Sequence, residues 1–142
     1  MKILVSACLL GENCKYNGGN NLSPTVLKFL EGHEVIPVCP EVEAGMGCPR
    51  IPVEIVNGIL TDKNGNNVDA PMRATIAKRL QELQGQNIDC AVLKSRSPTC
   101  GVRQVYDGTF SGRLIDGAGL FAQALMDAGY RVMDSEDIPM KK

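Results

Sequence analysis

The stretch Ile88-Asp89-Cys90-Ala91-Val92-Leu93 decides the fold class. It is short and apolar at nearly every position, which is typical of a strand that is covered on both faces, as in a parallel sheet. Similar short runs occur at Lys2–Ser6, at Glu34–Val38 and at Tyr130–Met133. Pro37 lies within the second of these runs and places it at a sheet edge or at a strand end. The sequence therefore predicts several strands of one sheet, spread along the chain.

Helical patterns separate these strands. The first begins at Ser23-Pro24, where a serine can cap the helix and proline suits its first position, and it ends at Gly32. The longest predicted helix runs from about Pro71 to Gln84 with Asp69 as its cap, and the last runs from Gly119 to Ala128. Alternation of strand and helix predicts an α/β fold: an open, mainly parallel, Rossmann-like sheet with helices on both faces.

Two short hairpins and a tail complete the predicted pattern. Residues 53–56 and 59–60 form two extended pieces around a turn, and a second hairpin is expected within residues 101–117. A chain of 142 residues has the length of one ordinary domain. We therefore expect a single α/β domain over residues 1–142, with a loose tail from about residue 134.

Charge and hydropathy limit the possible functions. Fifteen basic and sixteen acidic residues give a net charge of −1, so the overall charge does not support binding along a nucleic-acid backbone, although a local basic patch could still bind nucleic acid. No apolar stretch is long enough for a signal peptide or a membrane span. We expect a cytoplasmic protein that does not contact membranes and binds a small molecule.

Three of the six cysteines follow strands of the predicted sheet. Cys8 comes two residues after the first strand, Cys39 comes directly after the second, and Cys100 comes seven residues after Leu93. In the cytoplasm, such thiols serve metal binding or catalysis more often than disulfides. Ligands of open α/β sheets bind beyond the carboxyl ends of the strands, so these three cysteines should converge on one site.

The spacing of the cysteines bears on which metal they could bind. The chain has no CxxC pair and one histidine, a poor match to structural zinc, whereas an iron–sulfur cluster accepts cysteines that are scattered along a chain. Cys90 lies inside a strand and is expected to be a buried apolar residue. Cys14 and Cys48 lie in the same loops as Cys8 and Cys39, and their capacity to bind metal is left open.

A set of sequence motifs extends along the chain. It consists of Ser6-Ala7-Cys8-Leu9-Leu10-Gly11, Lys15-Tyr16-Asn17-Gly18, Pro37-Val38-Cys39-Pro40-Glu41, Pro49-Arg50, Leu93-Lys94-Ser95-Arg96-Ser97-Pro98-Thr99-Cys100-Gly101 and Tyr106-Asp107-Gly108-Thr109-Phe110-Ser111-Gly112. Together with the final helix, these motifs cover nearly the whole chain. As a set they resemble the 2-thiouracil desulfidase family, long classed as a domain of unknown function.

The resemblance implies an enzyme that uses a [4Fe-4S] cluster. Cys8, Cys39 and Cys100 match the three cysteines that hold the cluster in this family, and the free iron takes the sulfur of a thiolated uracil. Glu41 and Ser97 match a carboxylate and a hydroxyl beside the cluster, which makes them the expected catalytic residues. The expected reaction is hydrolytic removal of sulfur from 2-thiouracil or a related pyrimidine, with uracil and sulfide as products.

Three cations near these motifs are candidate substrate-binding residues. Lys94, Arg96 and Arg50 could orient carbonyl oxygens or a phosphate of the substrate. The substrate could be a free base, a nucleoside or a nucleic acid, and the oligomeric state is open.

Other functions are also compatible with the same residues. A non-catalytic metal-binding or thiol redox-sensing module could use the same cysteines. A nucleotide-binding regulatory domain fits less well, because the chain has neither a GxGxxG motif nor a Walker loop.

Overall fold

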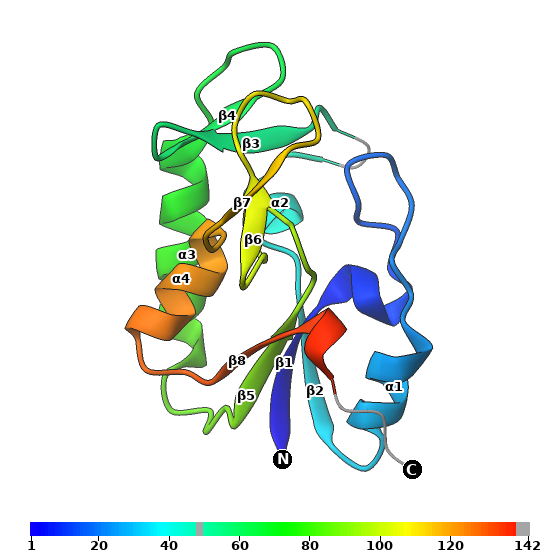
Figure 1. Cartoon of the computed structure of the whole chain (residues 1–142). Coiled ribbons are helices and arrows are strands. Elements are labelled where there is room, and N and C mark those ends of the chain that lie inside the picture. Colours follow the sequence, from blue (N-terminus) through cyan, green and yellow to red (C-terminus); the bar gives the residue numbers. More distant parts are fainter. Residues whose placement is uncertain (48–49, 139–142) are drawn as a thin grey trace.

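A parallel four-stranded sheet forms the centre of the protein (Figure 1). The computed structural model describes residues 1–47 and 50–138, and its central sheet has the strand order β2-β1-β5-β8. The bounds of these strands are β1 Lys2–Ser6, β2 Glu34–Val38, β5 Cys90–Leu93 and β8 Val132–Asp134. In the register, Leu4 of β1 lies opposite Ile36 of β2 and Ala91 of β5. This confirms the predicted mainly parallel α/β fold, and β2, which contains Pro37, lies at an edge.

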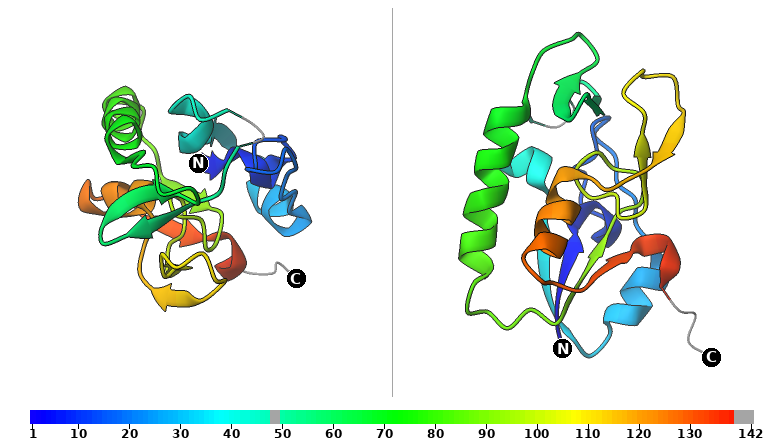
Figure 2. Two further views of the ribbon diagram at one scale, coloured as in Figure 1. Left: turned by 90° about the horizontal axis from the view of Figure 1, so that it is seen from above. Right: turned by 60° about the vertical axis from the view of Figure 1, so that its left-hand side comes forward.

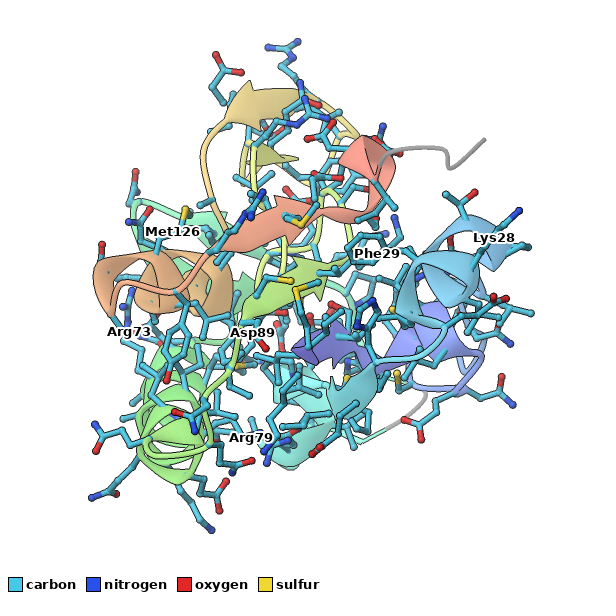
Figure 3. The ribbon with its side chains drawn as sticks, turned by 90° about the horizontal axis from the view of Figure 1, so that it is seen from below. Lys28, Phe29, Arg73, Arg79, Asp89 and Met126 are labelled. Carbon is cyan, nitrogen blue, oxygen red and sulfur yellow. The ribbon has the colours of Figure 1, made fainter. Side chains whose placement is uncertain are left out.

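Helices cover both faces of this sheet, as predicted (Figure 2). They are α1 Pro24–Leu30 on one face, and α3 Asp69–Leu83 and α4 Leu120–Asp127 on the other. Seen from below, Phe29 of α1 and Arg79 of α3 lie on opposite sides of the sheet (Figure 3). Successive strand residues point to opposite faces, so Ile3 and Val5 pack with α1 while Leu4 packs with α3 and α4.

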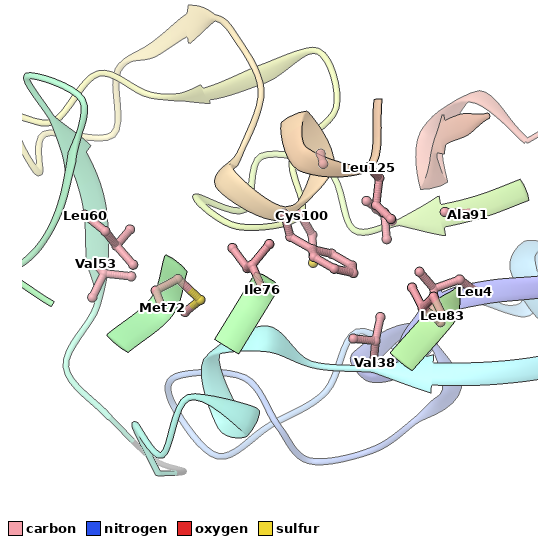
Figure 4. Packing of buried hydrophobic residues seen from close by; sticks show 13 residues of the cluster. Leu4, Val38, Val53, Leu60, Met72, Ile76, Leu83, Ala91, Cys100 and Leu125 are labelled. Atoms are coloured by element: carbon pink, nitrogen blue, oxygen red, sulfur yellow. The ribbon is translucent and has the colours of Figure 1, made fainter. Parts of the chain in front are cut away.

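Two apolar clusters result from this arrangement. The larger one lies between the sheet and helices α3 and α4, and Cys100 belongs to it (Figure 4). The smaller one lies between the sheet and α1 and includes Cys90, which is 4% exposed. Cys90 is therefore the buried apolar residue that the sequence predicts. Each fully buried aliphatic side chain in such a cluster stabilises the fold by about 1.5–3 kcal/mol.

The two antiparallel hairpins lie beyond the carboxyl ends of the parallel strands (Figure 1). Their strands are β3 Val53–Val56 with β4 Ile59–Asp62, and β6 Gln104–Tyr106 with β7 Leu114–Asp116. Three short helical segments complete the fold: η1 Ala7–Leu10, α2 Pro40–Glu43 and η2 Ser135–Asp137. The sequence predicted the hairpins but none of these three segments.

The start of α3 differs from the prediction. The helix begins at Asp69, two residues before Pro71, and Asp69 is its first residue and not its cap. The Asp69 carboxylate is used elsewhere: Oδ1 accepts the backbone N–H of Leu60 at 2.9 Å and Oδ2 pairs with Arg73. Asp69 thus ties strand β4 to the helix.

The described part of the segment that we expected to be loose, residues 134–138, packs against the rest of the protein. Asp134 is buried and its Oδ1 accepts the backbone N–H of Glu136 at 2.8 Å, which starts η2. Ile138 is 6% exposed and packs in the cluster beside α1. Residues 139–142, together with Cys48 and Pro49, lie outside the described residues. Within the part of the chain that is described, no helix has the length and apolar character needed to cross a membrane.

Candidate active site

The three strand-end cysteines line one cavity. Cys8, Cys39 and Cys100 follow β1, β2 and β5, and all three contribute to the wall of a cavity of about 500 Å³ at this edge of the sheet. Cys14 lines it as well, and Glu54 of β3 and Tyr106 of β6 bring the two hairpins to its wall. The predicted convergence of thiols at the carboxyl ends of the strands therefore exists in the structure.

Cys8 is held by a tight turn after β1. It lies in η1, and its carbonyl oxygen accepts the backbone N–H groups of Gly11 at 3.2 Å and Asn21 at 2.9 Å. Gly11 has a φ of 94°, a conformation that glycine adopts without strain. The turn ends η1 there and brings the loop of residues 11–21 back beside Cys8.

Cys39 is positioned by the start of α2. It is the N-cap residue of this helix and Pro40 fills the first helical position. Its backbone N–H donates to Glu43 Oε2 at 3.1 Å, and Glu43 Oε1 lies 3.6 Å from Arg79 Nε of α3. Arg79 also donates to the carbonyl of Pro37 at 3.1 Å, so one side chain of α3 connects both sides of Cys39.

Cys100 lies in a compact loop that two glycines make possible. A Cβ atom at Gly101 would lie 2.7 Å from the carbonyl oxygen of Ser97, and one at Gly119 would lie 2.5 Å from the backbone of Thr99. Ser97 Oγ accepts the backbone N–H groups of Thr99 at 3.2 Å and Cys100 at 3.0 Å. The side chain of Ser97 therefore shapes the loop that carries Cys100.

The thiols affect one another electrostatically. The pKa of Cys100 is raised to about 12, chiefly by burial. Among the smaller effects, a hydrogen bond from Ser6 lowers the pKa, and the neighbouring Cys8 and Cys39 raise it. Burial also raises the pKa of Cys39 and of Cys14, and the two side chains hydrogen-bond to each other. In the metal-free protein the Cys14, Cys39 and Cys100 thiols are therefore protonated at neutral pH, and metal binding must release their protons.

The donor set fits an iron–sulfur cluster. Cysteines scattered along a chain are the usual protein ligands of such clusters, and here three of them line one cavity. Across residues 1–47 and 50–138, no group of three or more His, Cys, Asp and Glu side chains is arranged to hold a metal ion. A cluster has a different requirement, because each cysteine binds a different iron atom.

Glu41 lies in the same cavity and forms a buried ion pair. Arg50 Nε donates to Glu41 Oε1 at 2.9 Å, and the two side chains are only 7% and 11% exposed. Thr99 Oγ1 donates to Glu41 Oε2 at 3.1 Å and lies 3.1 Å from Ser97 Oγ. The two predicted catalytic residues, Glu41 and Ser97, are thus brought together through Thr99.

The three predicted substrate-binding cations also line the cavity, but each has protein partners. Arg50 is used by Glu41 and by the carbonyl of Gly47. Arg96 forms two hydrogen bonds of 2.9 Å with the carboxylate of Glu136, and Lys94 Nζ donates to the hydroxyl and carbonyl of Ser95 at 2.9 and 3.2 Å. All three cations therefore lie at the wall, and Arg50 in addition orients the Glu41 carboxylate.

Sequence reasoning did not identify three further polar residues of the site. Thr99 bridges Glu41 and Ser97, and Ser6 interacts with Cys100. Glu54 is 8% exposed and accepts the backbone N–H groups of Gly108 and Phe110, which fixes the second hairpin over the cavity. Thr99 directly precedes the predicted ligand Cys100, and Ser6 lies two residues before the predicted ligand Cys8. This closeness in sequence is the signal that could have identified them as residues of the site.

Fold and site together define the class of protein: a small parallel α/β protein with cysteines gathered at the carboxyl ends of its strands. The chain belongs to the 2-thiouracil desulfurase family, whose sequence profile matches residues 3–137. It is 36% identical to the uncharacterized protein YbbK of Bacillus subtilis (strain 168), over 96% of this chain and 97% of YbbK.

A solved structure of high similarity supports the same family assignment. The structure of the [4Fe-4S]-dependent thiouracil desulfidase TudS matches this chain with a TM-score of 0.89 and 33% identity, over 97% of this chain and 93% of TudS. These findings confirm the family resemblance that the motifs indicate.

Proposed function

We propose that the protein is a desulfidase that removes sulfur from a thiolated pyrimidine, 2-thiouracil or a related compound, and releases sulfide. One observation carries the proposal: three strand-end cysteines, Glu41 and Ser97 all line a single cavity. Membership of the 2-thiouracil desulfurase family and the likeness to TudS support the same activity.

Cys8, Cys39 and Cys100 would hold a [4Fe-4S] cluster, as the family resemblance implies. Their side chains come from three different loops, so three irons would be ligated and one left without a protein ligand. When bound, the cluster supplies an open iron position for the soft sulfur of a thiocarbonyl group, which makes the ring carbon more electrophilic.

Glu41 is the proposed general base. In the overall reaction a thiocarbonyl and water give a carbonyl and hydrogen sulfide, so a proton must leave the attacking water. The Glu41 carboxylate is fixed by Arg50 on one oxygen and by Thr99 on the other, and each oxygen keeps a further lone pair for a proton. Ser97 lies on the same hydrogen-bonded chain and is the proposed donor to the ring nitrogen or its positioning group.

The cavity suits a small planar substrate. Its volume of about 500 Å³ lies in the usual range for small-molecule sites. Lys94 and Arg96 lie at the wall as proposed contacts for the substrate's oxygen atoms. Both side chains can still donate, because ammonium and guanidinium groups carry more N–H donors than their protein partners accept.

The test is anaerobic purification followed by metal counting and turnover. We expect brown protein with about four iron and four sulfide per chain. Incubation with 2-thiouracil or 4-thiouracil should give uracil and sulfide in equal amounts. Colourless, zinc-loaded protein without turnover would contradict the proposal and support the non-catalytic metal-binding alternative.

A further inference from the structure

Thr99 lies between the two side chains to which the proposed function assigns proton chemistry. Its Oγ1 is 3.1 Å from Glu41 Oε2 and also 3.1 Å from Ser97 Oγ. Thr99 is 1% exposed, so bulk water does not compete for these contacts. Its hydroxyl therefore connects two groups that come from distant parts of the sequence.

The direction of both hydrogen bonds follows from the donors and acceptors present. The Glu41 carboxylate, paired with the Arg50 guanidinium, offers only acceptors, so Thr99 donates to it. Ser97 Oγ already accepts two backbone N–H groups, which use both of its lone pairs. Before substrate binds, its own proton is thus left for Thr99 Oγ1, and the chain runs from Ser97 through Thr99 to Glu41. Donation from Ser97 to the ring nitrogen would require this proton to turn toward the substrate.

We propose that Thr99 is a positioning residue for the desulfidase reaction, which fixes the orientation of both the Glu41 carboxylate and the Ser97 hydroxyl. This inference rests on the proposed function. Arg50 holds one carboxylate oxygen and Thr99 the other, and together they prevent rotation about the last bond of the Glu41 side chain. Without the Thr99 hydroxyl, Glu41 keeps one of these two contacts and Ser97 loses the acceptor for its proton.

The backbone at Thr99 is anchored independently of its side chain. Its carbonyl oxygen accepts the N–H groups of Phe121 at 2.9 Å and Ala122 at 3.1 Å, at the start of α4. Gly119 packs against the same peptide without room for a Cβ atom. A change confined to the side-chain hydroxyl should therefore leave the loop in place. It also removes the long contact of 3.9 Å between Thr99 Oγ1 and Cys100 Sγ, so the iron content of each variant is measured beside its turnover.

The test compares Thr99→Val, which keeps the shape and removes the hydroxyl, with Thr99→Ser, which keeps the hydroxyl. Both variants are purified anaerobically with their cluster. Loss of a hydrogen bond to a charged group predicts a fall in kcat of about 10-fold to 100-fold for Thr99→Val, with KM little changed. Thr99→Ser should restore most of kcat. Thr61→Val, which removes an exposed hydroxyl outside the cavity, is the matched control and should turn over like the wild type.

A crystal structure of Thr99→Val provides a readout that does not depend on activity. We expect the Glu41 carboxylate to turn away from its present position while its contact with Arg50 remains. Thr99→Ala replaces Thr99→Val if the valine variant fails to fold.

Two results would overturn the role of Thr99. One is wild-type turnover by Thr99→Val with an intact cluster, and the other is a Thr99→Ser variant as slow as Thr99→Val, which would indicate packing alone. If the wild type holds its cluster but releases sulfide from no thiolated pyrimidine, the proposed function fails instead. The crystal structure then decides the role of Thr99, because an unmoved Glu41 contradicts it.

Discussion

Replacement of Glu41 by glutamine should reduce turnover while the protein keeps its cluster and still binds the substrate. Glutamine keeps the shape and an oxygen that can accept from Arg50, but it cannot take a proton from water. Loss of a general base predicts a fall in turnover of about 100-fold to 10,000-fold. The change also leaves the Arg50 guanidinium, 7% exposed, without a charged partner. Breaking a buried pair in this way costs about 3–5 kcal/mol of folding free energy.

The assay measures both effects on the same protein. Sulfide release and uracil formation are followed under anaerobic single-turnover conditions, with iron content determined in parallel. Thermal unfolding of the same samples should show a melting temperature lower by on the order of 10 °C. Glu31→Gln is the control, because it removes a carboxylate that is exposed at the end of α1 and does not line the cavity. It should retain both the cluster and near-normal turnover.

A double variant shows whether the missing base or the unpaired Arg50 charge causes the loss of turnover. Glu41→Gln combined with Arg50→Met removes both charges and should recover much of the lost stability, while turnover stays low. Near-normal turnover of Glu41→Gln with a full cluster would refute the general-base assignment. Recovery of turnover in the double variant would do the same, because it would attribute the defect to the unpaired charge.

Further predictions concern the cysteines. Cys8→Ser, Cys39→Ser and Cys100→Ser should each abolish iron retention, measured after anaerobic purification. If Cys14→Ser loses its iron while these three variants keep theirs, the ligands are misassigned. Cys90→Ala should keep its iron and lose about 1 kcal/mol in urea unfolding, because its thiol only packs in the smaller cluster. The reduced, cluster-free protein should lose stability as pH rises from about 9 toward 12. The reason is that the unfolded chain releases the Cys100 proton near pH 9.0, whereas the folded chain keeps it up to a pKa of about 12. Urea unfolding of Cys100→Ala over the same pH range should show a flatter dependence, and an equally steep one would assign the effect to another group.

The strands and their mainly parallel pairing could be predicted because each strand carries its own signal in the sequence. Residues 88–93 are apolar on both faces, and the strand they form, β5, lies inside the sheet between β1 and β8. Helix α2 carries a weaker signal, since it spans only Pro40–Glu43 within a stretch rich in glycine and proline. Its marker is Pro40 at the first helical position, which also explains why Cys39 sits at a helix cap.

The site was predictable in location but not in its contacts. The rule that ligands bind at the carboxyl ends of parallel strands brings Cys8, Cys39 and Cys100 together without side-chain coordinates. The pairing of Thr99 with Glu41 joins residues 58 positions apart, and no local pattern encodes it. Whether these residues act as ligands and catalytic groups stays a prediction until the variants are measured.

The order of strands has a consequence for how the protein matures. Strand β1 pairs with β5, so Ile3 lies opposite Cys90, and this contact forms only after most of the chain has been synthesised. Such non-local parallel pairing makes folding slow, because a long loop must close before the contacts form. Cys100 joins Cys8 and Cys39 only when that pairing is complete. If these three cysteines hold a cluster as proposed, the cluster would be inserted only once β1 and β5 have paired.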